Sequence, residues 1–179
     1  YSFDRKENVQ QCEEYDLEKR DFPEILHIGI DFNIDPCSAV VMYKTPKGIL
    51  HIIDEIRIFG SNTDELVDEI KTRYPKSKIW AYPDPAGRQR KTSANGMTDI
   101  IILQNADFVV KAPNKHPAVR DRINAVNSQL CSSSGQRRLL VDPRCRYVIE
   151  SLERQVYKEG SMQPDKESGY DHTNDALGY

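Results

Sequence analysis

Short apolar runs separated by turn residues dominate the first third of the chain. Runs at residues 25–32, 38–43 and 48–56 are rich in Ile and Val and have the length of strands, so each predicts a β-strand. Residues 45–48, Thr-Pro-Lys-Gly, lie between the last two runs and indicate an antiparallel hairpin. The break at residues 35–36, Asp-Pro, indicates a second tight turn. We therefore expect three consecutive antiparallel strands.

The pattern then changes to helical spacing. From Ser61 or Asn62, either of which can serve as N-cap, apolar residues recur at helical positions as far as Tyr74. Pro75 ends this helix, and a short strand follows at residues 79–82. A strand that is reached through a helix requires a crossover, so we expect it to lie parallel to a neighbouring strand.

Helices and short strands alternate in the rest of the chain. Polar residues at 86–96 and 157–170 predict loops, and a polar hairpin is the alternative for the second stretch. The order predicts an α/β fold: a mixed sheet of three antiparallel strands plus parallel strands, with helices on both faces. This is the order of the ribonuclease H-like fold. The remaining helices are expected at residues 98–104, from Pro117 to the Ser and Gly residues at 132–135, at 143–157 and at 172–179, and the remaining strands at 108–110 and 138–141.

Composition narrows the possible functions of these 179 residues. Apolar residues make up 38% of the chain and no run is as long as a membrane-spanning helix, which excludes a membrane protein. The net charge of −3 is unlike that of a non-specific nucleic-acid binder, so any DNA contact must come from local basic patches. The four cysteines show no Cys-x-x-Cys spacing, which argues against zinc sites or disulfides and fits a reducing compartment.

Residues 1–24 differ from the rest because they are highly charged and carry few aliphatic side chains. They predict a linker or arm, with a surface helix over residues 1–20 leading into the domain as the alternative, and Pro23 punctuates the chain near their end. We therefore expect one domain at residues 25–179. The chain begins at Tyr1 without a leader sequence, which indicates a piece of a larger protein and not a secreted precursor.

Two aspartates stand where predicted strands end. Asp31 closes the first strand, and Asp84 follows the strand at residues 79–82. If these strands are adjacent and parallel, their carboxyl ends meet at one edge of the sheet, where open sheets bind ligands. Two carboxylates at strand spacing repel each other unless a cation lies between them, and hard oxygen ligands suit Mg²⁺ or Mn²⁺. The alternative is that both aspartates are ordinary turn residues.

A third acidic group lies in the last predicted helix. His172 and Asp175 are three residues apart, and Asp171 and Asp175 are four apart, so all three share one helix face. The alternative is helix capping, with Asp171 or Thr173 as the N-cap. Spacing alone does not separate these two interpretations.

Three segments together resemble the nuclease domain of a tailed-phage large terminase. They are Gly-Ile-Asp-Phe at 29–32, Tyr-Pro-Asp-Pro-Ala-Gly at 82–87 and, as the most specific, Asp-His-Thr-Asn-Asp-Ala-Leu-Gly-Tyr at 171–179. The resemblance covers residues 26–179, and residues 1–20 resemble the joint after that family's motor domain. It implies a ribonuclease H-like domain that cuts concatemeric viral DNA with two divalent metal ions, Mg²⁺ or Mn²⁺, held by acidic residues.

When the family's site residues are matched to these motifs, the resemblance implies that Asp31, Asp84 and Asp175 are catalytic metal ligands. His172 matches a residue that lines or joins the metal site. Asp31 is expected to bridge two ions, one that activates a water and one that stabilises the leaving oxygen. Gly178 departs from the family, in which many members have Arg, but it lies outside the ligand set.

Basic residues near these motifs are candidates for contacts with DNA phosphates. They follow the fourth and fifth strands at the same end of the sheet, and a solvated surface is the alternative. No Gly-x-x-x-x-Gly-Lys-Ser/Thr loop occurs, so we expect no ATPase activity in this fragment. The candidate DNA-binding residues are Arg88, Arg90, Lys91, Lys111 and Lys115.

These observations favour a metal-dependent endonuclease that works by two-metal-ion phosphodiester hydrolysis. One alternative is a junction resolvase or transposase-like phosphoryl transferase of the same fold, and another is a non-catalytic domain that docks DNA or a portal. The resemblance implies double-stranded DNA as partner, with the portal protein and the terminase small subunit in the full-length context. We expect no membrane association and a location in the host cell cytoplasm during infection.

Overall fold

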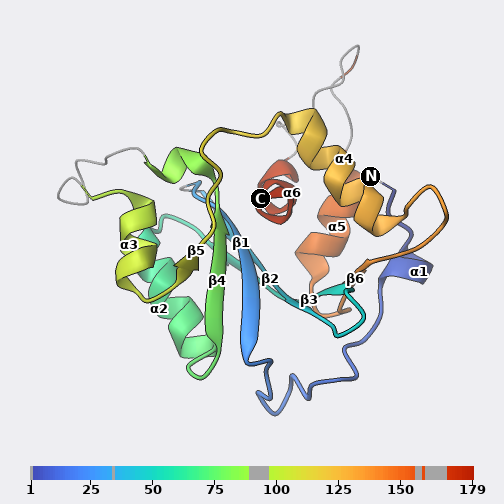
Figure 1. Ribbon diagram of the computed structural model, residues 1–179, viewed down its shortest axis with the longest axis horizontal. Helices are drawn as coiled ribbons and strands as arrows, with labels where there is room; N and C mark the ends of the chain where they lie inside the picture. Colours follow the sequence, from blue (N-terminus) through green and yellow to red (C-terminus); the bar gives the residue numbers. More distant parts are fainter. Residues whose placement is uncertain (1, 34, 89–96, 156–158, 160–168) are drawn as a thin grey trace.

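A single mixed sheet with helices on both faces organises the chain in a computed structural model (Figure 1), which describes residues 2–33, 35–88, 97–155, 159 and 169–179. The sheet has six strands in the order β5-β4-β1-β2-β3-β6. The predicted α/β class and mixed sheet are confirmed.

The centre of the sheet is an antiparallel meander. It consists of β1 (Ile25–Asp31), β2 (Cys37–Lys44) and β3 (Leu50–Ile58), each paired antiparallel to the next. At the β2–β3 turn, Gly48 has φ +81°, a backbone conformation that glycine adopts without a steric cost. The hairpins expected from the turn residues are therefore present.

Parallel strands extend the meander on both sides. β4 (Lys78–Pro83) pairs parallel to β1, and β5 (Val109–Val110) pairs parallel to β4. At the far edge, β6 (Leu139–Val141) pairs parallel to the start of β3. The crossover predicted for the fourth strand is confirmed. The carboxyl ends of β1, β3 and β4 all lie at the same end of the sheet, which we call its carboxyl edge.

Helices α2 and α3 cover one face of the sheet. α2 (Thr63–Arg73) begins with a capping box in which Asn62 and Glu65 bond each other's backbone N–H groups. α3 (Asp99–Asn105) begins at Thr98, whose hydroxyl accepts a hydrogen bond from the N–H of Ile101. Their apolar residues join those of the strands in one buried cluster. Of the two caps considered for α2, the structure uses Asn62.

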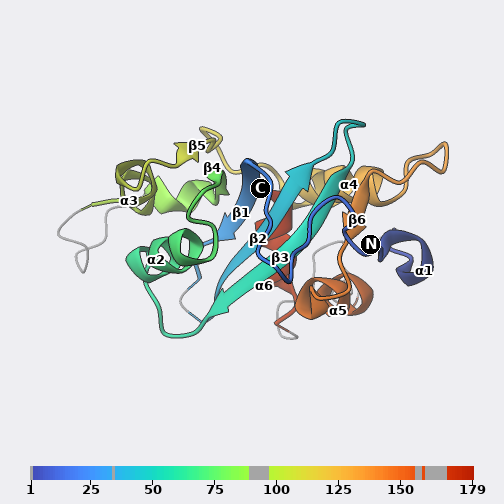
Figure 2. The ribbon, with the colours of Figure 1, turned by 90° about the horizontal axis from the view of Figure 1, so that it is seen from below.

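Three further helices cover the opposite face, as Figure 2 shows from below. They are α4 (Val119–Leu130), α5 (Arg146–Arg154) and α6 (Asp171–Gly178), which share a second buried cluster with the strands. α6 starts after Tyr170 without a side-chain cap, so neither Asp171 nor Thr173 serves as the N-cap. The capping interpretation of these residues therefore does not hold.

Helix α6 lies directly on β1 because Gly29 has no side chain. A Cβ atom built on Gly29 would lie 1.9 Å from the carbonyl oxygen of Ala176, which is much closer than two non-bonded heavy atoms can approach. The glycine therefore sets how closely α6 approaches the sheet. Because Asp31 is two residues farther along β1, this contact also sets the distance between Asp31 and the side chains of α6.

The first residues of the chain pack against the domain. A short helix, α1 (Arg5–Asn8), is followed by Val9, which forms an isolated bridge with Val141. Asn8 is buried and donates hydrogen bonds to two backbone carbonyls, and Cys12 and Leu17 join the cluster beneath α2. The division of the chain at residue 25 stays a prediction. Among the helices of the described ranges, none has the length and apolar character needed to cross a membrane.

Candidate active site

The first two predicted residues lie side by side at the carboxyl edge of the sheet. Ile30 of β1 is paired with Pro83 of β4, and the N–H of Asp84 donates to the carbonyl of Ile30 at 2.9 Å. Asp31 is the last residue of β1 and is only 7% exposed. The strand pairing therefore places Asp31 at the end of β1 and Asp84 one residue beyond the adjacent, parallel β4, as the sequence predicts.

A tight turn follows Asp84 and fixes its side chain. The carboxylate accepts a hydrogen bond from the N–H of Ala86 at 2.8 Å, at the start of the short 3₁₀ helix η1 (Pro85–Arg88). Gly87 lies against the ring of Phe32, where an added Cβ would be 2.4 Å from a ring carbon. The glycine thus lets the turn after β4 close over the end of β1.

Helix α6 brings His172 to Asp31. The Nδ1 atom of His172 lies 3.2 Å from a carboxylate oxygen of Asp31, and Asn33 faces the same imidazole nitrogen. The hydrogen bond to Asp31 raises the pKa of His172 above its usual value, although burial acts in the opposite direction. Asp171, also on α6, is buried, and its negative charge raises the same pKa. The predicted shared face of the last helix is therefore directed at the end of β1.

The third predicted carboxylate, Asp175, forms an ion pair with Arg122 of α4. The N–O distance is 3.0 Å, and the arginine side chain is only 10% exposed. Its guanidinium also lies 4.5 Å from the ring centre of Tyr179. Sequence reasoning missed Arg122, although it occupies a position of the apolar stripe of α4 that includes Val126. A charged residue within such a stripe is the signal that identifies a buried ion pair.

A second residue that sequence reasoning missed is His116. It lies in the loop between β5 and α4, where its Nδ1 atom is 3.3 Å from Asp84 and its side chain is 58% exposed. Because 32 residues separate the two along the chain, no local spacing indicates the contact. His116 gives the exposed side of the site an imidazole beside a predicted metal ligand.

The phenol of Tyr179 is influenced by all three carboxylates. Burial is the largest cause of the raised pKa of its phenol, and the negative charges of Asp84, Asp175 and Asp31 raise it further. Arg122 acts in the opposite direction. Carboxylates from β1, from the turn after β4 and from α6 therefore act on a single hydroxyl group.

The donor set suits hard divalent cations. Across the described ranges, no three His, Cys, Asp or Glu side chains meet closely enough to hold an ion by themselves. Each carboxylate instead has its own neighbour: His172 for Asp31, His116 for Asp84 and Arg122 for Asp175. Mg²⁺ is usually bound by one or two carboxylates plus water and substrate phosphate, so this arrangement fits such ions, and the ligand assignment stays a prediction.

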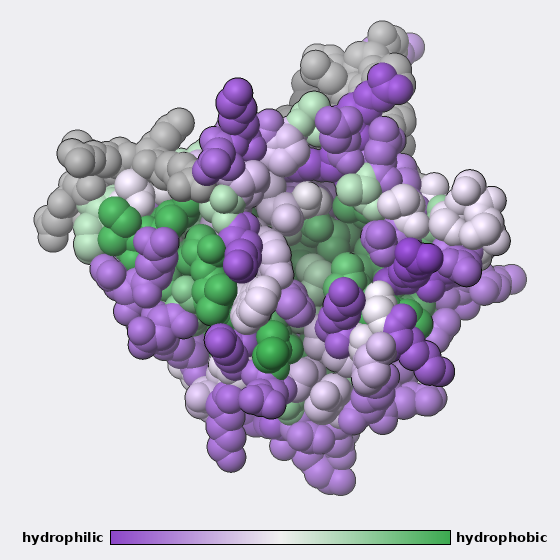
Figure 3. All heavy atoms as spheres, in the orientation of Figure 1, coloured by the Kyte–Doolittle hydropathy of each residue, from purple (hydrophilic) through white to green (hydrophobic). Residues whose placement is uncertain are grey.

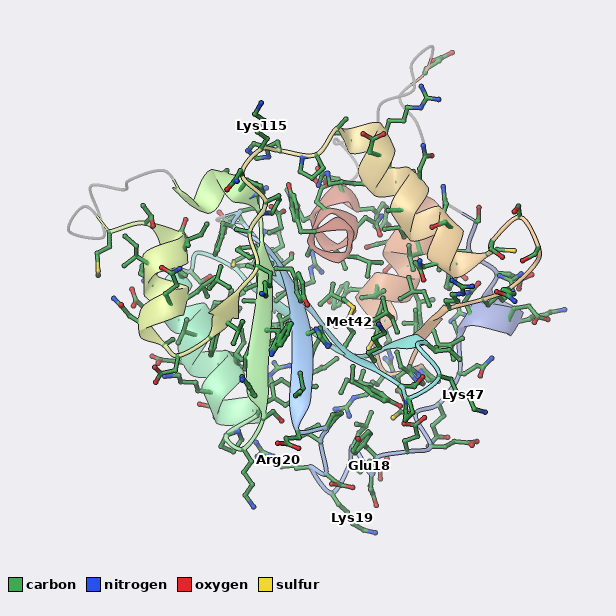
Figure 4. The ribbon with its side chains drawn as sticks, viewed as in Figure 1. Glu18, Lys19, Arg20, Met42, Lys47 and Lys115 are labelled. Atoms are coloured by element: carbon green, nitrogen blue, oxygen red, sulfur yellow. The ribbon has the colours of Figure 1, made fainter. Side chains whose placement is uncertain are left out.

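The predicted basic residues have different positions. Lys115 lies on the exposed loop beside His116, at the upper edge of the molecule in Figure 4, whereas Lys111 places its ammonium group 5.3 Å from the ring centre of Trp80. Arg90, Lys91 and the side chain of Arg88 lie outside the described residues. Figure 3 shows that this face of the molecule is hollowed between β1 and α4, with hydrophilic side chains along its rim.

The sheet order, the acidic strand ends and the helix across β1 define the class of the protein, a ribonuclease H-like domain of the nuclease type. A family model described as the terminase RNaseH-like domain matches residues 28–179. The chain therefore belongs to this family, and the resemblance seen in the sequence is confirmed. No curated protein matches the chain in sequence.

Solved structures of phage enzymes have the same fold. The nuclease domain of the P22 large terminase matches with a TM-score of 0.67 and 14% identity, over 98% of this chain and 88% of that chain. The large terminase nuclease of thermophilic phage G20c with bound cobalt matches with a TM-score of 0.58 and 16% identity, over 98% and 87%. At such low identities the similarity establishes the fold alone.

Proposed function

We propose that this domain is a divalent-metal-dependent endonuclease that cuts concatemeric double-stranded viral DNA during genome packaging. One observation carries the proposal: Asp31 and Asp84 stand at the carboxyl ends of the adjacent, parallel strands β1 and β4, and helix α6, which carries Asp175, places His172 3.2 Å from Asp31. Membership of the terminase family supports viral DNA as the substrate. The cobalt bound by the G20c nuclease supports the use of a divalent metal. In the full-length protein, the portal protein and the small subunit would be further partners.

Asp31, Asp84 and Asp175 would hold two ions, Mg²⁺ or Mn²⁺. When bound, such ions supply a water of lowered pKa as nucleophile and stabilise negative charge on the leaving oxygen. Asp31 is the choice for the shared ligand because its strand end lies beside Asp84 and beneath α6.

The neighbouring side chains hold these carboxylates in place. The raised pKa of His172 favours the protonated, cationic form of its imidazole beside Asp31. This positive charge limits the repulsion among the carboxylates. Arg122 does the same for Asp175 from helix α4. Both residues therefore keep the acidic groups close together, which the chemistry requires.

Plasmid cleavage tests the proposal. The purified domain is incubated with supercoiled plasmid and with Mg²⁺, Mn²⁺ or EDTA, and nicked and linear products are separated by electrophoresis. We expect cutting with either metal, none with EDTA, and a steep loss of cutting as salt rises because phosphate contacts dominate the binding of DNA.

Matched variants separate catalysis from folding. Asp31→Asn should abolish cutting and keep the cooperative thermal unfolding of the parent, whereas Asp68→Asn, on the surface of α2, should change neither. Undiminished cutting by Asp31→Asn, or cutting in EDTA, would refute the proposed site.

A further inference from the structure

An arginine two strands away faces the same side of the sheet as Asp31. Asp31 is paired with Ser38 on β2, and Ser38 is paired with Arg57 on β3. Directly paired residues of antiparallel strands project from the same face. Two strand spacings of about 4.8 Å put the backbones of Asp31 and Arg57 roughly 10 Å apart along the carboxyl edge of the sheet.

Two aromatic rings hold the guanidinium of Arg57. It lies 4.2 Å from the ring centre of Tyr147 and 5.5 Å from that of Phe59. Tyr147 lies in the first turn of α5, where the carboxylate of Glu55 accepts hydrogen bonds from the N–H groups of Tyr147 and Val148. The cation–π contacts therefore join the end of β3 to the start of α5 and restrict the arginine to one position.

The surroundings of this arginine leave its hydrogen-bonding capacity unused. Within the described part of the chain, no hydrogen bond or ion pair engages the side chain of Arg57, and its Nε atom is buried. The hydroxyl of Ser38, on the strand between Arg57 and Asp31, is also buried and unbonded. By contrast, Arg73 and Arg122 each bind a carboxylate. Arg57 is partly exposed, so the terminal N–H groups of its guanidinium can bind an acceptor from outside the chain, whereas the buried Nε atom and the Ser38 hydroxyl cannot be reached by one.

The aromatic pair is also exposed to an unusual degree. Phe59 is 65% exposed and Tyr147 is 52% exposed, although large apolar side chains are ordinarily covered. Together the two rings and the guanidinium form one cationic and apolar patch, which we call the Arg57 patch. It lies on the edge that carries the candidate active site.

We propose that the Arg57 patch binds a backbone phosphate of the DNA strand that is cut, close to the reacting phosphate along that strand. The placement follows from the roughly 10 Å between the backbones of Arg57 and Asp31. A planar guanidinium donates two parallel hydrogen bonds to a phosphate, and its fixed position lowers the entropy lost on binding. This inference rests on the proposed nuclease function and adds a specific substrate contact to it.

Duplex binding measures the contribution of Arg57. A fluorescently labelled duplex is titrated with the domain in EDTA, so that no cutting occurs, and the affinity is measured by anisotropy at several salt concentrations. We expect Arg57→Ala to bind roughly tenfold more weakly and to lose about one unit of the slope of log affinity against log salt. Arg57→Lys should keep the salt slope of the parent, because it retains the positive charge. Its affinity should lie between those of the parent and Arg57→Ala, because lysine lacks the planar guanidinium that donates two parallel hydrogen bonds.

A matched control is Lys47→Ala. Lys47 is an exposed cation in the β2–β3 turn, at the opposite end of the sheet from Lys115 (Figure 4). It should leave both affinity and salt slope unchanged. Thermal unfolding of each variant in the absence of DNA shows whether a loss of binding reflects a loss of folded protein.

The outcomes distinguish this inference from the proposed function. If the parent domain cuts plasmid and Arg57→Ala binds duplex with the same affinity and slope, the DNA contact is refuted and the nuclease proposal stands. If the parent domain cuts no DNA under any metal condition, the nuclease proposal itself fails. A patch that binds an acidic protein and not DNA would also contradict the assignment.

Discussion

At the scale of single residues, the site balances three carboxylates with cationic or titratable neighbours. Asp175 relies on Arg122, whose guanidinium is almost entirely buried between α6 and the ring of Tyr179. Removing one member of such a pair takes its ion-pair partner from the other charge, which costs more than the pair itself contributes.

Arg122→Ala should therefore lower the free energy of unfolding by about 2 kcal/mol, below the 3–5 kcal/mol of a fully buried pair because Asp175 retains some exposure. Urea unfolding of Arg122→Ala, Asp175→Asn and the double variant measures this. In the double variant the second change should cost little once the first has been made. Strictly additive losses would contradict the coupling.

At the same scale, His172 supports Asp31 and is not required to hold an ion, since histidine is not the usual ligand of Mg²⁺. His172→Ala should accordingly retain more plasmid cutting than Asp31→Asn. Initial nicking rates of the two variants, measured side by side in Mg²⁺, test the ranking. A His172→Ala variant as inactive as Asp31→Asn would contradict the supporting role.

At the scale of elements, the contact between α6 and β1 positions the candidate site. Gly29→Ala would force the carbonyl of Ala176 away from the sheet, and α6 with it. We expect a loss of about 3 kcal/mol in the free energy of unfolding, typical of severe overpacking, together with a large loss of cutting because His172 and Asp175 move.

The matched control for this prediction is Gly48→Ala, in the turn at the opposite end of the sheet. A Cβ atom on Gly48 would meet only the flexible side chain of Lys44, at 4.0 Å, but the φ of +81° makes alanine unfavourable by about 1 kcal/mol. This variant should lose stability and keep full activity when folded. Full activity in Gly29→Ala would show that the position of α6 does not matter for the site.

The same elements show what sequence can and cannot predict. The strand ends that carry Asp31 and Asp84 followed from short apolar runs and the crossover rule, and the pairing of β1 with β4 confirms them. The partners of His116 and Arg122 could not be predicted, because each contact joins residues far apart in the chain: His116 reaches Asp84 from a loop, and Arg122 reaches Asp175 from a neighbouring helix. In the sequence, Gly29 is only one residue of a motif, and its steric role depends on the contact with α6, which no local pattern encodes.

At the scale of the whole molecule, a buried histidine connects the first residues of the chain to the sheet. His51 of β3 is buried, and its Nε2 atom lies 2.9 Å from the carbonyl of Gln10. Burial lowers the pKa of His51 below its usual 6.5. The unfolded chain then binds this proton at a higher pH than the folded protein does, so stability is lost as pH falls below that value.

Between pH of about 7.5 and about 5.5, we expect the parent to become less stable relative to His51→Gln, because only the parent loses the contribution of neutral His51. Urea unfolding of both proteins at the two pH values measures the difference. Glutamine keeps a hydrogen-bond donor for Gln10 without a titratable group. Equal pH dependence in the two proteins would contradict the assignment to His51.

The central claim is that Asp31, Asp84 and Asp175 hold two divalent ions at the carboxyl edge of the sheet. The most direct measurement is anomalous X-ray diffraction from a crystal of this domain soaked in Mn²⁺. The account predicts two anomalous peaks within ligand distance of these carboxylates, with Asp31 contacting both and the ions roughly 3.5–4 Å apart. Well-ordered carboxylates without any anomalous peak between them, or a peak bound only elsewhere on the protein, would contradict it.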